Sequence, residues 1–228
     1  MRDFFITNGA VIASVIAAAE LLLTAALFAA FAKKQQPAIL LAALIALGLT
    51  FDAAVMALGR VISPDILPVL SRIRFVSHGL LVPLNIAVCG YALRWEHTKK
   101  MTVIWVITAI VCLLGAASGF ARVLELRDFA GMLRHVAGDS TPLWADKINR
   151  VLSFGTVLPL IAAGVAVIIR EKNPSIFLAG LLMFVFAAVG PATGNADLIF
   201  LISMIGELLM AVFFLCFALT AYRSNDEI

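Results

Sequence analysis

Seven mainly apolar stretches follow one another along this chain, and short clusters of charged residues separate them. Each stretch has roughly the 20 residues that an α-helix needs to cross a hydrocarbon core about 30 Å thick. We therefore predict an all-α integral membrane protein, with residues 1–228 forming a single domain of seven transmembrane helices in one bundle. The predicted spans are residues 8–31, 38–60, 71–94, 102–121, 148–169, 174–193 and 197–221.

The connection over residues 122–147 is longer than the others, and apolar and charged residues alternate along it. The apolar ones are Leu124, Phe129, Met132, Leu133 and Val136, and the charged ones include Arg127, Asp128 and Arg134. We expect a short amphipathic helix in the membrane interface, either as a structural element or as a lid over a site. Pro142 follows Ser140 and Thr141, which is a helix start signal, so the fifth span could begin before residue 148.

Two pairs of segments suggest an internal repeat. Residues 33–42 resemble residues 170–179, and residues 78–81 resemble residues 206–209. These matches indicate a 3+1+3 plan with parallel repeats, in which the fourth span is the linker. Leu- and Ala-rich sequence also matches itself by chance, so the repeat is an interpretation that needs independent support.

Composition agrees with a membrane protein and excludes several other classes. The chain is 63% hydrophobic and 14% charged, and its mean hydropathy is +1.06. The net charge of +3 comes from basic residues near helix ends, so no nucleic-acid partner is expected. The three cysteines all lie inside apolar stretches, which predicts free thiols without a disulfide framework. The lipid bilayer is therefore the first expected partner, and the oligomeric state stays open.

The distribution of lysines gives a prediction for orientation. Ala30-Phe31-Ala32 resembles a signal-peptide cleavage site, but Glu20 and the following lysines argue that the first helix is retained. Short loops after the first, third and fifth spans carry basic residues directly at helix ends, although the opposite loops have nearly as many in total. We expect the N-terminus outside and the C-terminus in the cytoplasm of a bacterial inner (plasma) membrane.

Four ionisable residues lie inside the predicted spans: Glu20, Asp52, His78 and Glu207. Each costs on the order of 2.5–3.5 kcal/mol or more at a helix centre, so each requires a partner or a function. At about 1.5 Å per residue they lie roughly 10–18 Å below the outer ends of their helices. They therefore share one layer in the outer half of the bundle.

The third span adds further polar residues to this layer. Arg74, His78 and Asn85 fall on one helix face, and Pro83 leaves the Gly79 carbonyl without its helical donor. The predicted substrate- or ion-binding residues are Glu20, Asp52, His78, Asn85 and Glu207. The predicted headgroup or anion contacts are Arg60, Arg72 and Arg74. Each side chain also has a simpler interpretation, because carboxylates can bond nearby backbone groups and arginines can reach the headgroups.

The same residues exclude several chemistries. His97 and His135 lie in predicted loops, so a three-histidine zinc site is not expected, although His78 and two carboxylates could in principle ligate a metal. The sequence has no glycine-rich phosphate loop, no HExxH and no CxxC motif, and the last span has no lysine for a retinal Schiff base. We predict no metal site and no cofactor.

Three functions remain open. Carboxylates and a histidine within the membrane favour transport of a small solute or ion coupled to protons or cations, with Asp52 and Glu207 as the carriers. An intramembrane lipid-active enzyme would instead use His78 and a carboxylate for acid/base catalysis, and Arg72 and Arg74 for a headgroup phosphate. A non-catalytic subunit of a membrane complex is the third hypothesis. The expected ligand is accordingly a small solute, an ion or a lipid.

Overall fold

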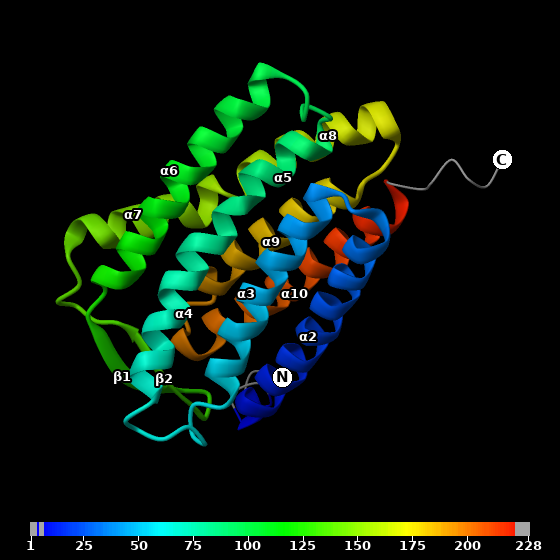
Figure 1. Ribbon diagram of the computed structural model, residues 1–228. Helices are drawn as coiled ribbons and strands as arrows, with labels where there is room; N and C mark the ends of the chain where they lie inside the picture. Colours follow the sequence, from blue (N-terminus) through cyan, green and yellow to red (C-terminus); the bar gives the residue numbers. More distant parts are fainter. Residues whose placement is uncertain (1–3, 5–6, 222–228) are drawn as a thin grey trace.

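The computed structural model describes residue 4 and residues 7–221, and seven helical spans account for most of them (Figure 1). The first two and the fourth are single helices, and so are the last two. The third and fifth are interrupted. In chain order the spans are α2 (Gly9–Lys34), α3 (Pro37–Ala57), α4 with η1 and α5 (Leu67–Leu81, Val82–Leu84, Asn85–Ala92), α6 (Lys99–Ala121), α7 with α8 (Leu143–Gly155, Leu158–Glu171), α9 (Ser175–Ala192) and α10 (Ala196–Thr220). The predicted all-α class and seven-helix bundle are confirmed.

Proline positions coincide with both interruptions. Pro83 has no backbone N–H, and the third span passes there through the 3-10 turn η1 before α5 begins. Pro159 lies in the first turn of α8, just after α7 ends at Gly155. The fifth span begins at Leu143 after Pro142, which confirms its early start. The seventh span is one continuous helix while the third is broken, and the 3+1+3 repeat stays a prediction.

The amphipathic helix predicted within residues 122–147 is wrong. Strands β1 (Leu124–Phe129) and β2 (Met132–Ala137) form an antiparallel hairpin there. Phe129 pairs with Met132, so the turn contains only Ala130 and Gly131, both with positive φ. A turn of this kind matches the twist of two paired strands. The alternation of apolar and charged residues thus has the period of a strand, which the helical interpretation overlooked.

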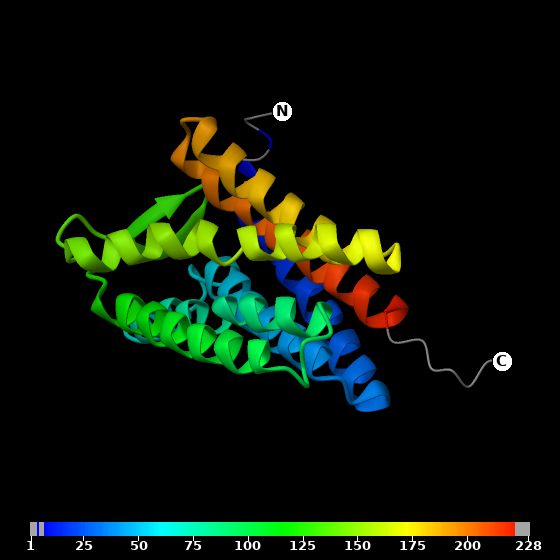
Figure 2. The same ribbon diagram turned by 90° about the horizontal axis from the view of Figure 1, so that it is seen from above.

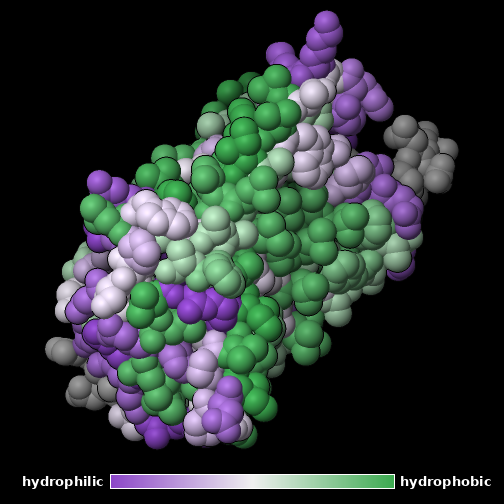
Figure 3. All heavy atoms as spheres, turned by 60° about the vertical axis from the view of Figure 1, so that its left-hand side comes forward, coloured by the Kyte–Doolittle hydropathy of each residue, from purple (hydrophilic) through white to green (hydrophobic). Residues whose placement is uncertain are grey.

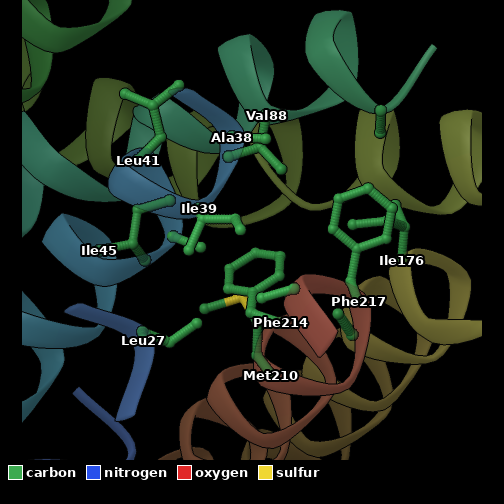
Figure 4. Close-up of a cluster of buried hydrophobic side chains, with 14 of the residues drawn as sticks. Leu27, Ala38, Ile39, Leu41, Ile45, Val88, Ile176, Met210, Phe214 and Phe217 are labelled. Atoms are coloured by element: carbon green, nitrogen blue, oxygen red, sulfur yellow. The ribbon is translucent and has the colours of Figure 1, made fainter. Parts of the chain in front are cut away.

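The helices pack against one another around two apolar clusters. Helix α2 packs against α3 and α10, α9 packs against α10, and α4 packs against α6 (Figures 1 and 2). The main apolar core joins α10 to its neighbours, where Phe214 and Phe217 meet Leu27, Ile39 and Ile176 (Figure 4). A smaller apolar cluster links the hairpin turn to α2, α3 and α10. The hairpin therefore closes its end of the bundle through apolar contacts.

The surface has the pattern expected for a membrane-embedded chain. Hydrophilic side chains gather at the two ends of the long axis, and apolar side chains dominate between them (Figure 3). Helix α6 illustrates the apolar region, because Val106, Ile110 and Leu113 are all more than half exposed. Such exposure is costly in water and favourable in lipid. Fold and surface together describe a polytopic membrane protein.

Candidate functional site

A cavity of about 460 Å³ lies within the bundle, between α3, α4, α6, α7, α9 and α10, and strand β2 contributes to its wall. A volume of this size suits one small molecule. Much of the lining is apolar. Its polar and charged lining residues are Asp52, Arg74, His78, Asn85, Ser118, Arg122, Arg134, Asn149, Arg150, Ser153, Thr156, Ser203 and Glu207.

Asp52 is the centre of a buried network on one wall of this cavity. Its Oδ1 accepts a hydrogen bond from Arg74 Nη1 at 2.8 Å, and its Oδ2 lies 3.0 Å from His78 Nδ1. Both partners come from α4, where a separation of four residues places them on the same face. Arg74 Nη2 also donates to the backbone carbonyl of His135 at 2.9 Å, which ties the network to the hairpin. Both oxygens of Asp52 are therefore already bonded.

Two further carboxylates approach this network from other helices. Glu207 of α10 lines the cavity and interacts electrostatically with His78, Asp52, Glu20 and Arg74. Glu20 of α2 is fully buried, does not line the cavity, and has no hydrogen-bond partner for either oxygen among the described residues. Helices α2, α3 and α10 thus bring three acids within electrostatic range of one another. A charged carboxylate without compensating contacts is costly at such a position.

Asn85 is the remaining predicted ligand-binding residue. It lies at the start of α5, immediately after η1, and is fully buried at the cavity wall. Its Nδ2 donates weakly to Met210 Sδ at 3.8 Å, while its Oδ1 has no partner among the described residues. The structure therefore places Asp52, His78, Asn85 and Glu207 around one cavity, with Glu20 behind them.

The predicted headgroup arginines have different positions. Arg60 forms an ion pair with Asp128 and donates to the Gly131 carbonyl, so it holds the hairpin turn. Arg72 donates to the carbonyls of Phe120 and Arg122 at the end of α6. Neither of these two lines the cavity, whereas Arg74 does. Arg60 and Arg72 thus connect segments of the fold, Arg60 through an ion pair and a backbone carbonyl and Arg72 through backbone carbonyls.

Three cavity arginines were not among the predicted site residues, and one of them, Arg150, is exposed and paired with Asp146 on the same helix. The other two are less exposed. Arg134 of β2 is 5% exposed, and its Nη1 donates to Met56 Sδ at 2.9 Å while its Nε has no acceptor among the described residues. Arg122 follows α6, and its Cζ lies 4.4 Å from the centre of the Phe75 ring. Burial and the neighbouring Arg74 charge lower the pKa of Arg122 to about 10 and lower the pKa of Arg134 well below its ordinary value.

Sequence reasoning treated these two residues only as charges in a connection. The signal that could have revealed Arg134 is its place in an alternating segment, because a strand directs alternate residues toward the bundle. Arg122 offered only its position immediately after a span.

The comparisons with known proteins add no family. No protein-family model matches the chain, and no curated protein matches it. Within the part of the chain that the structure describes, no group of three or more His, Cys, Asp or Glu side chains could hold a metal ion. The fold and the cavity therefore define the class: a polytopic membrane protein with a charged intramembrane cavity.

Proposed function

We propose that the protein transports a small solute across the membrane with coupling to protons, and that the cavity is the solute site. The observation that carries this proposal is the convergence of Asp52, His78, Asn85 and Glu207 on one cavity within the membrane-spanning helices. Intramembrane ionisable groups that line a cavity are typical of solute and proton pathways.

Glu207 is the better candidate for the proton carrier. Asp52 is already bonded through both oxygens to Arg74 and His78, so a change in its protonation would break two contacts. Glu207 lines the cavity, and no described residue forms an ion pair with it. The charged groups that interact electrostatically with it are His78, Asp52, Glu20, Arg74 and Arg134. A bound solute would change the electrostatic environment of Glu207, which is the physical basis of coupling.

Both helix interruptions lie at the cavity, and this supports a moving site. Val82 and Pro83 of η1 line it, and so do Thr156 and Val157 at the break between α7 and α8. Broken helices at a midplane site let helix segments move relative to one another and expose backbone groups to a solute. The two breaks lie on different spans, so either side of the cavity could open in turn.

The test is proton movement in proteoliposomes that contain a pH-sensitive dye. A panel of anionic, cationic and neutral small solutes is applied one at a time as an outward or inward gradient. We expect at least one solute to change the internal pH in wild-type vesicles and not in Glu207→Gln vesicles. Glu96→Gln, at an exposed carboxylate in a loop, is the matched control and keeps the wild-type response. Proton movement unchanged in Glu207→Gln, or none with any solute, would reject the proposal.

A second candidate function rests on the Asp52–His78 pair. The bond from His78 Nδ1 to Asp52 orients the ring and leaves Nε2 for acid/base chemistry at the cavity wall. A lipid-active enzyme would convert lipid in nanodiscs into products of new mass, and His78→Gln would abolish the conversion. If lipid masses stay constant while solute-driven proton movement occurs, transport is favoured over this alternative.

We also infer that the end opposite the hairpin faces the cytoplasm of a bacterial plasma membrane. Basic residues gather at that end, where Lys34 donates to the Ala218 and Leu219 carbonyls and Arg170 donates to the Leu93 carbonyl. Labelling of Lys99→Cys and Asp139→Cys in intact cells with a membrane-impermeant maleimide tests this orientation. Asp139→Cys should react and Lys99→Cys should not, and the reverse result would invert the topology.

A further inference from the structure

The charges on the cavity wall do not balance. Four guanidinium groups and His78 line it, together with the carboxylates of Asp52 and Glu207. Arg74 is neutralised by Asp52, and Arg150 is paired with Asp146. Arg122 and Arg134 form no ion pair with any carboxylate in the described residues. Two cationic groups at the cavity therefore have no carboxylate in direct contact among the described residues, and Asp52 and Glu207 act on Arg134 only at longer range.

The surroundings of these two arginines position them without neutralising them. Arg134 Cζ lies 3.1 Å from the centre of the Phe200 ring, and Arg122 stacks on Phe75, which also lies 4.4 Å from Arg74 Cζ. Aromatic faces attract a guanidinium but cannot replace a carboxylate or phosphate as a hydrogen-bond acceptor. Arg134 shows this directly, because in the described part of the chain its buried Nε has no acceptor and its Nη1 bonds a thioether. An anion in the cavity would supply the missing acceptors.

The rest of the wall is suited to an apolar body. Leu49, Met56, Met183, Met204 and Met210 line the same cavity. Methionine side chains adapt to ligands of different shapes because they are unbranched and polarisable. The cavity thus combines two cationic residues, Arg122 after α6 and Arg134 on β2, with apolar residues from α3, α9 and α10. Helices α3 and α10 also carry the cavity acids Asp52 and Glu207.

We infer that the ligand of this cavity is an organic anion, whose carboxylate or phosphate group is held by Arg122 and Arg134 and whose apolar part contacts the methionine-rich wall. This assignment rests on the proposed function in one respect, because it takes the cavity to be the solute site. It differs from the cation-binding role that the acids suggested, because Asp52 is occupied by Arg74 and His78. A water-soluble anion and an anionic lipid headgroup share this chemistry, so the experiment must separate them.

The experiment is calorimetric binding to the full chain in phosphatidylcholine nanodiscs. The probes are phenylacetate, phenyl phosphate and phenethylammonium, which have similar size and differ in charge. We expect at least one anionic probe to bind saturably and the cation not to bind. Arg122→Gln and Arg134→Gln should each weaken anion binding by about tenfold or more, and Arg134→Lys by less. The control is Arg127→Gln, an exposed hairpin arginine that is paired with Glu125 and lies outside the cavity.

Three results would overturn the assignment: equal binding of phenethylammonium, unchanged binding by Arg134→Gln, or no saturable binding of either anion up to about 10 mM. Thermal unfolding of each variant shows that it is folded. Arg134→Gln should unfold no earlier than wild type, because it removes an unpaired buried charge; clearly earlier unfolding with unchanged binding would make Arg134 purely structural.

Repeating the titrations in nanodiscs that contain phosphatidylglycerol separates the two ligand sources. Weaker phenylacetate binding in those discs would show competition by a lipid headgroup, and unchanged binding would indicate a water-soluble anion; both support an anion site. Failure of this inference is distinct from failure of transport. Anion binding without solute-driven proton movement rejects transport alone, whereas proton movement driven by cationic or neutral solutes without anion binding rejects only the ligand class.

Discussion

Removing Asp52 should strongly destabilise the fold, because it leaves the Arg74 charge buried. Arg74 is 4% and Asp52 8% exposed, and the two side chains are 2.8 Å apart. In Asp52→Asn the guanidinium keeps the carbonyl of His135 and a neutral amide oxygen as acceptors but loses its carboxylate. Loss of one partner of a buried ion pair costs about 3–5 kcal/mol. That is a factor of roughly 10² to nearly 10⁴ in the unfolding constant, since each 1.4 kcal/mol is tenfold.

The double variant separates the pair from the individual residues. The double variant Asp52→Asn with Arg74→Gln removes both charges. We expect it to lose less free energy of unfolding than the two single variants lose in sum, by a coupling energy of about 2 kcal/mol or more. Unfolding by SDS in mixed micelles at pH near 7, followed by tryptophan fluorescence, gives the free energies. Arg60→Gln, which breaks an exposed pair with Asp128, is the control and should cost no more than about 1 kcal/mol. A coupling below about 0.5 kcal/mol would refute the buried-pair argument.

Two further predictions use the same unfolding assay. Gly79→Ala should destabilise the protein by about 1–3 kcal/mol, because a Cβ there would overlap the carbonyl of Gly115 where α4 meets α6. Gly155→Ala should be tolerated, because a Cβ there would meet only the Val151 side chain, at 4.0 Å. Equal effects of the two substitutions would contradict the close contact at Gly79. Burial and the Arg74 charge lower the pKa of His135, so the unfolded chain binds a proton more readily than the folded one and stability should fall as pH drops below about 6.5. His135→Gln should reduce this pH dependence, and an unchanged pH profile would argue against it.

The sequence was sufficient to predict the seven spans. Each apolar stretch is expected to be a helix, because a helix bonds its own backbone groups where no water is present. The observed spans accordingly follow the predicted ones closely, and the prolines at 83 and 159 explain where the third and fifth are interrupted. The acids and the histidine within the spans could also be recognised from the sequence, because each is an ionisable residue in an apolar stretch.

The hairpin shows where the sequence became ambiguous. Residues 122–147 mix apolar and charged residues too briefly for one period to dominate, and the helical interpretation was wrong. Tertiary contacts favour the strands: Arg60 bonds the turn, Asp197 Oδ1 accepts from the Ala130 N–H at 2.9 Å, and Arg74 bonds the His135 carbonyl. None of these partners is near the hairpin in the sequence.

The sequence by itself thus determined the seven spans and marked Asp52, His78 and Glu207 as unusual, because hydrophobic length and an isolated charge are local properties. Only the tertiary structure decided that Asp52 is bonded to Arg74 and His78, and that Arg122 and Arg134 line the same cavity without an ion pair to any described residue. Charge balance at a cavity depends on side chains from several helices and a strand. It is therefore a property of the packed bundle, which no single segment of the sequence contains.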